Sequence, residues 1–533
     1  MLRSAWKPVA FGLALLALLL MVRHADAALA AVALPVNPHR AANIRFVMKF
    51  LLAGGCLCVC LWAVHFLWKP FLDQPRLPRA AMLLGILAFC TTIILLLPPF
   101  QAPDEMMHWR KAMEYYRPEG VNDPACKLAT HLGSYEIPFH GDHRQDVGRF
   151  HKEMPDDLES PNMAEFGYVS RCSYPLVLLV SLFYPRTATT AETLHFYYLC
   201  RVVPAVVLLL LLFWTNRRYR VPYTALVFFS LPIVLQQCCT VSADNFLNLG
   251  TFAAVLLFLH LRRSPSVRLT IVLWLLCLFL AYSKFVVAGV LVLPLLLVPF
   301  ARIPRKKIVV PLCVLAFAGA LAWFIPKAAA SLRHTGGMYG LEQVDAQFAA
   351  LQTWDGMRVF LGMYWNILRQ LWGVNCWSIN MGWLDVPLSP LHFALIHVAL
   401  YLALLLDLCQ FGPLVVRAAR SRWREVALAA GVIATNLLAN TCSVALAYFI
   451  VGVPPGGTAI AHWQMRHFFP GMIVLVLMPM LLWDNKNGDA APGTPRPGFL
   501  APALNGVALV FLPLLFFARN VELAIDLLAR YWW

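Results

Sequence analysis

The sequence predicts an all-α, polytopic integral membrane protein with about 11–13 transmembrane helices and two large loops on the outer face. Hydrophobic residues make up 60% of the 533 residues and charged residues only 13%, with a mean hydropathy of +0.67. Several apolar runs of about 17–25 residues are long enough to cross a bilayer. Basic residues lie in the short links between these runs, which indicates how the runs alternate across the membrane.

The apolar runs follow one another along most of the chain. We predict spans near residues 46–68, 80–97, 193–214, 222–239, 246–261, 268–283, 285–301, 308–326, 389–411, 425–451, 466–483 and 499–519. The stretch 268–301 is divided in two because a turn near Lys284 keeps every basic link on one side. Residues 173–184 are apolar but too short to cross, so we expect an interfacial or re-entrant segment there.

The N-terminal region has two interpretations. Residues 1–27 resemble a cleavable signal peptide, with a basic start, an apolar run and a small-residue motif, and the same stretch also reads as an uncleaved first helix that ends near Leu34. We divide the chain into an N-terminal extension (1–79), a transmembrane core (80–483), a flexible cytoplasmic linker (484–498) and a last helix with its tail (499–533). The core contains the two outer loops, at about 100–172 and 327–388.

The formal net charge of +16 is distributed unevenly. Residues 100–172 hold 13 acidic and 8 basic side chains, whereas the remaining basic residues concentrate in short links. These links contain Arg217, Arg218, Arg220, Arg262, Arg263, Arg268, the segment 302–307 and the segment 417–424. Short basic links mark the cytoplasmic side of a membrane protein, so the charge sets orientation. We therefore expect membrane lipids and no nucleic acid as partners.

The fourteen cysteines lie mostly inside apolar spans, where a thiol packs as a small hydrophobe. Cys126 and Cys172 both lie in the polar segment, so a disulfide between them and two free thiols both remain open. His140, Asp142, His143 and Asp146 form a histidine-rich group without a fourth ligand at suitable spacing. We expect no bound metal and no cofactor.

An acidic pair marks the end of the span 80–97. Pro103 suits the first turn of a new helix, where its missing N–H costs nothing, and Asp104 and Glu105 follow it directly. His108 lies one turn beyond Asp104, on the same helix face. The pair caps a helix N-terminus, where carboxylates are stabilised. Asp104 placed at a membrane surface is also suited to act as a general base.

Further polar residues interrupt the apolar runs on the same predicted face. They are Asp244, Lys284, Asp385, Arg466 and His467. Each has an ordinary structural interpretation: a helix cap for Asp244, a snorkelling side chain for Lys284 and interface anchoring for the others. Taken together, outer-face carboxylates and cations indicate a site that deprotonates a hydroxyl group and binds a lipid-attached phosphate. The chain has no convincing glycine-rich nucleotide loop.

Several of these segments occur together in one family. The chain resembles a family of predicted bacterial membrane proteins known as domain of unknown function 2142. The resemblance is carried, in order, by Pro98–His108, Ser173–Leu176, Val241–Asp244, Ser283–Val286, Gly382–Asp385 and Met465–Pro470. Two positions depart from the family pattern: Ala102 stands where the family usually has glycine, and His467 stands where it usually has tyrosine.

The family in turn looks like part of the GT-C glycosyltransferase superfamily, and this resemblance implies a many-helix fold with its active site in the first outer loop. It implies Asp104 as the general base, Glu105 orienting Asp104 or the acceptor, and His108 supporting them. Lys284 and Arg466 are implied as phosphate ligands. We add Asp244, Asp385 and His467 as substrate-binding candidates.

The expected reaction is transfer of a sugar from an undecaprenyl-phosphate-linked donor to a glycan or lipid-linked acceptor. The expected location is the bacterial inner membrane, with the active site facing the periplasm. Two alternatives remain open. One is a ligase or polymerase that moves whole glycans from lipid diphosphates, and the other is a transporter or flippase without chemistry. Acids near mid-membrane would favour the transporter, whereas acids at one surface favour an enzyme.

Overall fold

The computed structural model describes the chain in twelve ranges. They are residues 77–102, 105–116, 123–132, 152–154, 173–184, 189–219, 221–300, 341–371, 388–421, 423–452, 465–482 and 500–531. Every regular element within these ranges is a helix. The all-α polytopic membrane fold predicted from the sequence is confirmed.

Among the described residues, five helices are long and apolar enough to cross a bilayer. They are α3 (Leu77–Leu96), α7 (Thr190–Arg218), α10 (Ala243–Arg263), α16 (Pro390–Ser421) and α17 (Trp423–Gly452). Local sequence determines where two of them begin. Thr189 and Glu192 form a reciprocal capping box at the start of α7, and the Ser242 side chain accepts a hydrogen bond from the first turn of α10.

Shorter apolar helices complete the bundle. One group is α11 (Val267–Ser283), the 3₁₀ helix η5 (Phe285–Leu291) and α12 (Val292–Phe300). The second is η7 (Met465–Phe468), α18 (Phe469–Leu477) and η8 (Met478–Leu482). Because α11 ends at Ser283 and Lys284 is its C-cap, the predicted turn near Lys284 is confirmed. The last helix, α19 (Leu500–Tyr531), is longer than the predicted span because the tail continues it.

One predicted span is wrong as a single helix. Residues 222–239 form two seven-residue helices, α8 (Tyr223–Phe229) and α9 (Pro232–Cys238), separated by a turn at Ser230 and Leu231. The reason is Pro232, which has no N–H to continue the α8 hydrogen-bond ladder and instead starts α9 in its first turn.

The helices have two chemically distinct ends. At the end that we call the basic end, Arg79 donates to the carbonyl of Val221 and Arg262 pairs with Glu425. The C-terminal residues Arg217 and Arg218 of α7 also lie there, as do Arg263 and Arg424. The described basic links therefore share one end, as the charge pattern predicts.

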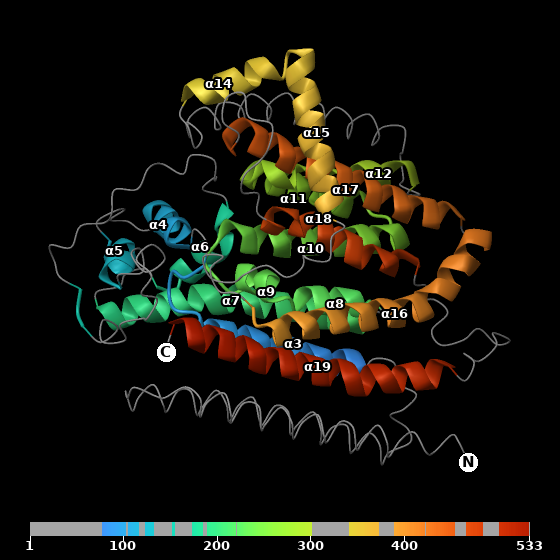
Figure 1. The fold of residues 1–533 in the computed structure, drawn as a ribbon, viewed down its shortest axis with the longest axis horizontal. Helices are drawn as coiled ribbons and strands as arrows, with labels where there is room; N and C mark the ends of the chain where they lie inside the picture. Colours follow the sequence, from blue (N-terminus) through green and yellow to red (C-terminus); the bar gives the residue numbers. More distant parts are fainter. Residues whose placement is uncertain are drawn as a thin grey trace.

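The opposite end, which we call the site end, carries the short polar helices. In Figure 1, α4 (Glu105–Tyr116), α5 (Pro124–His131) and α6 (Pro175–Ser181) gather at the left, where α3 ends and α7 and α10 begin. The Trp109 indole donates a 2.6 Å hydrogen bond to the carbonyl of Ala125, which joins α4 to α5. Two further helices, α14 (Leu341–Ala350) and α15 (Trp354–Leu371), pack beside α17 at the top of the view.

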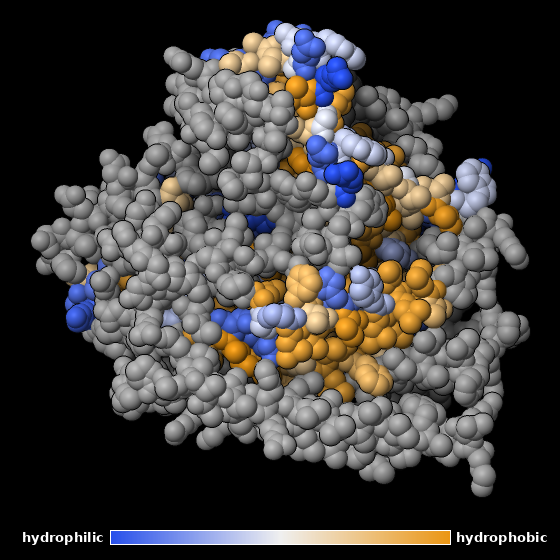
Figure 2. All heavy atoms as spheres, in the orientation of Figure 1, coloured by the Kyte–Doolittle hydropathy of each residue, from blue (hydrophilic) through white to orange (hydrophobic). Residues whose placement is uncertain are grey.

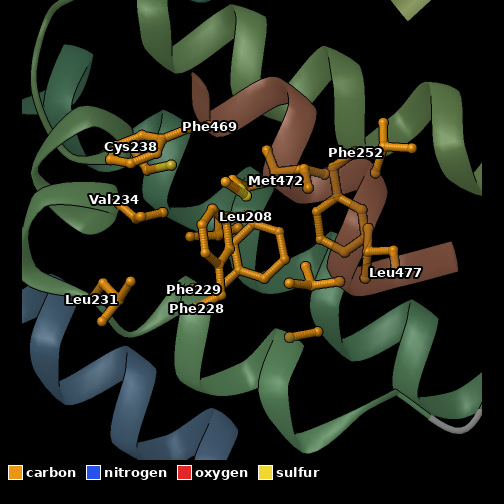
Figure 3. Packing of buried hydrophobic residues seen from close by; sticks show 14 of the residues in the cluster. Leu208, Phe228, Phe229, Leu231, Val234, Cys238, Phe252, Phe469, Met472 and Leu477 are labelled. Carbon is orange, nitrogen blue, oxygen red and sulfur yellow. The ribbon is translucent and has the colours of Figure 1, made fainter. Parts of the chain in front are cut away.

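The centre of the bundle is a continuous apolar core. Figure 3 shows side chains from α7, α8, α9, α10 and α18 meeting in one cluster. Phe229 stacks on Phe252 with ring centroids 4.9 Å apart, and Phe228 meets Phe469 edge to face at 5.9 Å. This packing brings α18, late in the sequence, against α8 and α10.

The outer surface of α16 is apolar, as expected for a helix in contact with lipid. Figure 2 shows hydrophobic side chains gathering where α16 runs. The large exposed ones on this helix are Leu391, Val398, Tyr401, Leu404, Leu405 and Leu408. Polar groups at the buried sides of the helices therefore need a separate explanation.

Candidate functional site

The turn between α3 and α4 holds an unusual backbone conformation. Phe100 has φ of 65°, in the left-handed region that side chains with a Cβ rarely adopt. Its ring packs against Tyr197 with centroids 4.7 Å apart, and its N–H donates to the Tyr197 hydroxyl at 3.0 Å. The surrounding contacts thus stabilise the strained turn that leads into α4.

Glu105, the first residue of α4, is held by Arg201 of α7. The Arg201 guanidinium donates to both Glu105 oxygens, from Nε to Oε1 at 3.0 Å and from Nη2 to Oε2 at 2.7 Å. Both side chains are fully buried. Arg201 also donates to the carbonyls of Leu97 and Pro98, at 2.7 and 3.0 Å. One arginine therefore binds the end of α3 and the start of α4 together.

Glu105 also contacts the loop before α10. Its Oε1 accepts a hydrogen bond of 2.9 Å from the backbone N–H of Val241. This contact joins the start of α4 to the segment that carries Asp244. With three donors on its two oxygens, the Glu105 carboxylate binds protein groups, which is the geometry of a positioning residue. Its predicted role in orienting an acceptor stays a prediction.

Three charged side chains from different parts of the chain meet at the site end; we call Asp244, Lys284 and Arg466 the charge cluster. Lys284 Nζ lies 2.7 Å from Asp244 Oδ1, and Arg466 Nε lies 3.8 Å from Asp244 Oδ2. The exposed fractions of the three side chains are only 6–7%.

Each member of the charge cluster sits at a helix terminus. Asp244 is in the first turn of α10, where its N–H donates to Ser242 Oγ at 3.0 Å. Lys284 follows the last residue of α11, and Arg466 lies in the 3₁₀ turn before α18. A helix N-terminus favours negative charge, so the Asp244 carboxylate is stabilised by α10 as well as by both cations.

His108 of α4 contacts Tyr174, the residue that precedes α6. Its Nδ1 lies 2.7 Å from the Tyr174 hydroxyl, and the neighbouring Ser173 Oγ donates to the carbonyl of Ser283 at 3.1 Å. The Ser173–Tyr174 segment thus bridges α4 and the residue before Lys284. His467 interacts electrostatically with the charge cluster and also with His108. The predicted residues Glu105, His108, Asp244, Lys284, Arg466 and His467 therefore belong to one region.

Other predicted residues lie outside the described ranges. These are Asp104, Asp385, Cys172 and the group His140, Asp142, His143 and Asp146. The described residues contain no set of three or more His, Cys, Asp and Glu side chains arranged to hold a metal ion.

Comparison with known proteins identifies the family. Residues 87–476 match a family model described as a predicted membrane protein, DUF2142. The chain belongs to the DUF2142 family. No curated protein and no solved structure matches it. The DUF2142 region runs from α3 to α18, so it includes the whole charge cluster and leaves α19 beyond its end.

Sequence reasoning missed two members of the DUF2142 site region. Arg201 lies within an apolar run, and an arginine inside a membrane span is a signal for an internal partner, although that partner cannot be read from spacing. Tyr197 carries no such signal, because a tyrosine in a span is usually packing or anchoring.

A second buried polar group joins α16, inside the DUF2142 match, to α19, which lies beyond its end. Asp526 Oδ2 lies 3.0 Å from His392 Nδ1, and Glu522 accepts a 2.8 Å hydrogen bond from Ser389 Oγ. Arg519 donates to the Ser230 hydroxyl and carbonyl at 2.9 and 2.7 Å. These contacts hold the start of α16 and the α8–α9 turn against α19. We therefore assign this group to the packing of the helices and not to the candidate site.

Proposed function

We propose that this DUF2142 protein is a membrane glycosyltransferase of the GT-C type. It moves a sugar from a polyprenyl-phosphate donor to a glycan or lipid-linked acceptor at the outer face of the bacterial inner membrane. The observation that carries the proposal is the charge cluster, in which Lys284 and Arg466 approach one point from distant segments at helix ends. Basic links at the opposite end favour an outward-facing site.

The proposed chemistry divides between Asp104 and the two cations. Asp104 takes the proton from the acceptor hydroxyl, and the hydroxyl oxygen of the acceptor bonds to the anomeric carbon of the sugar. The bond between that carbon and the phosphate oxygen breaks, and its electron pair leaves with the lipid phosphate. Lys284 and Arg466 bind this phosphate, and the planar guanidinium of Arg466 is suited to two phosphate oxygens. Glu105 and His108 position the neighbouring backbone through their contacts with Val241 and Tyr174.

The base is tested by Asp104→Asn, which retains the shape and removes the proton acceptor. We expect transfer of labelled sugar from a polyprenyl-phosphate donor in membranes to fall roughly 100-fold or more. Glu114→Gln is the matched control, because Glu114 belongs to the same acidic segment but pairs with Arg110 on the helix surface. Normal product formation by Asp104→Asn would show that another group is the base.

The phosphate site is tested by binding. Lys284→Met and Arg466→Met should each weaken binding of a polyprenyl monophosphate by roughly tenfold or more, because a charge-assisted contact is lost. Arg263→Met is the control, since Arg263 stacks on Tyr219 at the basic end. Equal weakening by all three variants would exclude a specific phosphate site at the charge cluster.

Donor choice separates this proposal from the two alternatives. The proposed glycosyltransferase uses a monophosphate-linked sugar, whereas the alternative glycan ligase uses a lipid diphosphate. A flippase moves the lipid-linked glycan between leaflets of proteoliposomes and forms no new glycosidic bond. Product from the diphosphate donor alone, or lipid movement without product, would replace the proposed function by the corresponding alternative.

A further inference from the structure

Two asparagines of α17 bind the segments that carry the cations. Asn440 Nδ2 donates a 2.6 Å hydrogen bond to the carbonyl of Val286, two residues beyond Lys284. The same nitrogen lies 3.5 Å from the carbonyl of His467, the neighbour of Arg466. An amide nitrogen has two hydrogens, so one side chain can serve both carbonyls. Asn436, one turn earlier, donates to the carbonyl of Gly289 at 2.7 Å.

Close packing keeps Asn440 between the two segments. A Cβ added at Gly289 would lie 2.8 Å from the backbone nitrogen of Asn440, so η5 lies directly against α17. A Cβ added at Gly471 would lie 2.6 Å from Asn440 Oδ1, so α18 meets the other side of the same amide. Asn440 is 1% exposed. Its amide therefore fills a narrow space between η5 and α18.

We propose that Asn440 is a positioning residue that sets the spacing of Lys284 and Arg466 for a lipid-linked phosphate. This inference rests on the proposed function. Lys284 and Arg466 lie on separate elements, and Asn440 is within hydrogen-bonding reach of the backbone beside both. A buried amide favours a state in which its N–H groups are paired, because an unpaired polar group is costly to bury. Small displacements of phosphate-binding groups cost affinity, because the ligand needs both cations at once.

The first experiment measures binding of a polyprenyl monophosphate to the full chain in nanodiscs. Asn440→Ala should weaken binding by roughly tenfold. Asn436→Ala, which also loses one hydrogen bond to η5, should show a comparable fall in melting temperature and a change in affinity of no more than about threefold. Asn440→Ser provides a second variant with a smaller loss of volume, and its hydroxyl has only one hydrogen, so it cannot donate to both carbonyls.

The second experiment uses no ligand. Gly471→Ala should lower the melting temperature in the wild-type background, because its Cβ meets Asn440 Oδ1. In the Asn440→Ala background the nearest remaining contact is the Asn440 Cβ, at an ordinary 3.5 Å, so most of that loss should disappear. Additive losses would overturn the proposed contact.

The outcomes separate this inference from the proposed function. Equal loss of affinity in the Asn440 and Asn436 variants would overturn the positioning role while wild-type binding persists. If the wild-type protein fails to bind the lipid phosphate, the proposed function is overturned and the inference with it. A selective loss in the Asn440 variants, together with non-additive melting temperatures, would support the positioning role.

Discussion

The Glu105–Arg201 pair is a fully buried ion pair near the site. Breaking a buried ion pair by removing one partner leaves an uncompensated charge, which typically costs about 3–5 kcal/mol. Arg201→Met should therefore lower the free energy of unfolding strongly, and it also removes the hydrogen bonds to Leu97 and Pro98. The measurement is thermal unfolding of the purified protein in detergent.

The double variant Glu105→Gln, Arg201→Met provides the control for charge. It contains neither partner's charge, so its loss of stability should be smaller than the sum of the two single losses. A strictly additive result would mean that the two side chains do not interact in the folded protein.

At the scale of single residues, sequence reasoning found all three members of the charge cluster. Asp244, Lys284 and Arg466 stood out because each charge interrupts or ends an apolar span. The convergence of Lys284 and Arg466 on the Asp244 carboxylate could not be predicted, since it depends on how α10, α11 and α18 pack. Arg201 and Asn440 were missed because their partners are backbone groups or side chains from distant segments, and no local pattern records such contacts.

At the scale of elements, the close approach of η5 to α17 has a direct test. Gly289→Ala places a Cβ 2.8 Å from a backbone nitrogen and 3.0 Å from a backbone oxygen of α17, and neither can move as a flexible side chain would. We expect a lower melting temperature and weaker phosphate binding, because Lys284 is at the start of the displaced segment. Thermal unfolding and lipid binding measure the two effects.

Gly431→Ala is the matched control on α17 itself. A Cβ at Gly431 would meet nothing within 4 Å, and alanine is favoured over glycine in a helix by about 0.5–1 kcal/mol. This variant should keep or raise the melting temperature. A similar fall in both variants would show that the contact between η5 and α17 is not the cause.

Span positions were predictable from hydropathy, whereas breaks within spans were less so. The turn at Lys284 followed from keeping the basic links on one side, and α11 ends there. The break between α8 and α9 was missed because residues 222–239 are mostly apolar and contain no charged residue, although Pro232 was visible in the sequence. Prolines are tolerated inside other helices of this bundle, as Pro204 is in α7, so the residue alone does not decide.

At the scale of the whole molecule, α19 supports the DUF2142 core from outside the family match. It packs along α3 and α16, and a Cβ at Gly85 of α3 would lie 2.8 Å from the Phe516 ring. Deleting residues 484–533 should expose the packed face of α3 and leave His392 without Asp526. We expect aggregation in detergent, measured by size-exclusion chromatography.

Supplying residues 484–533 as a separate chain should restore a monodisperse protein, because the contacts of α19 need no continuous backbone. Arg519→Leu within that separate chain is a useful variant, since it removes the hydrogen bonds to Ser230. A truncated protein that stays monodisperse alone would show that α19 is dispensable for the core.

The members of the charge cluster lie far apart in the sequence, and this determines the order in which their contacts can form during synthesis. A nascent chain folds from its N-terminus during synthesis. The Glu105–Arg201 pair becomes possible once residue 201 has been made, and the Asp244–Lys284 contact after residue 284. Arg466 arrives only with η7, after α16 and α17. A ribosome-bound chain therefore assembles the framework of its site well before it acquires the last cation.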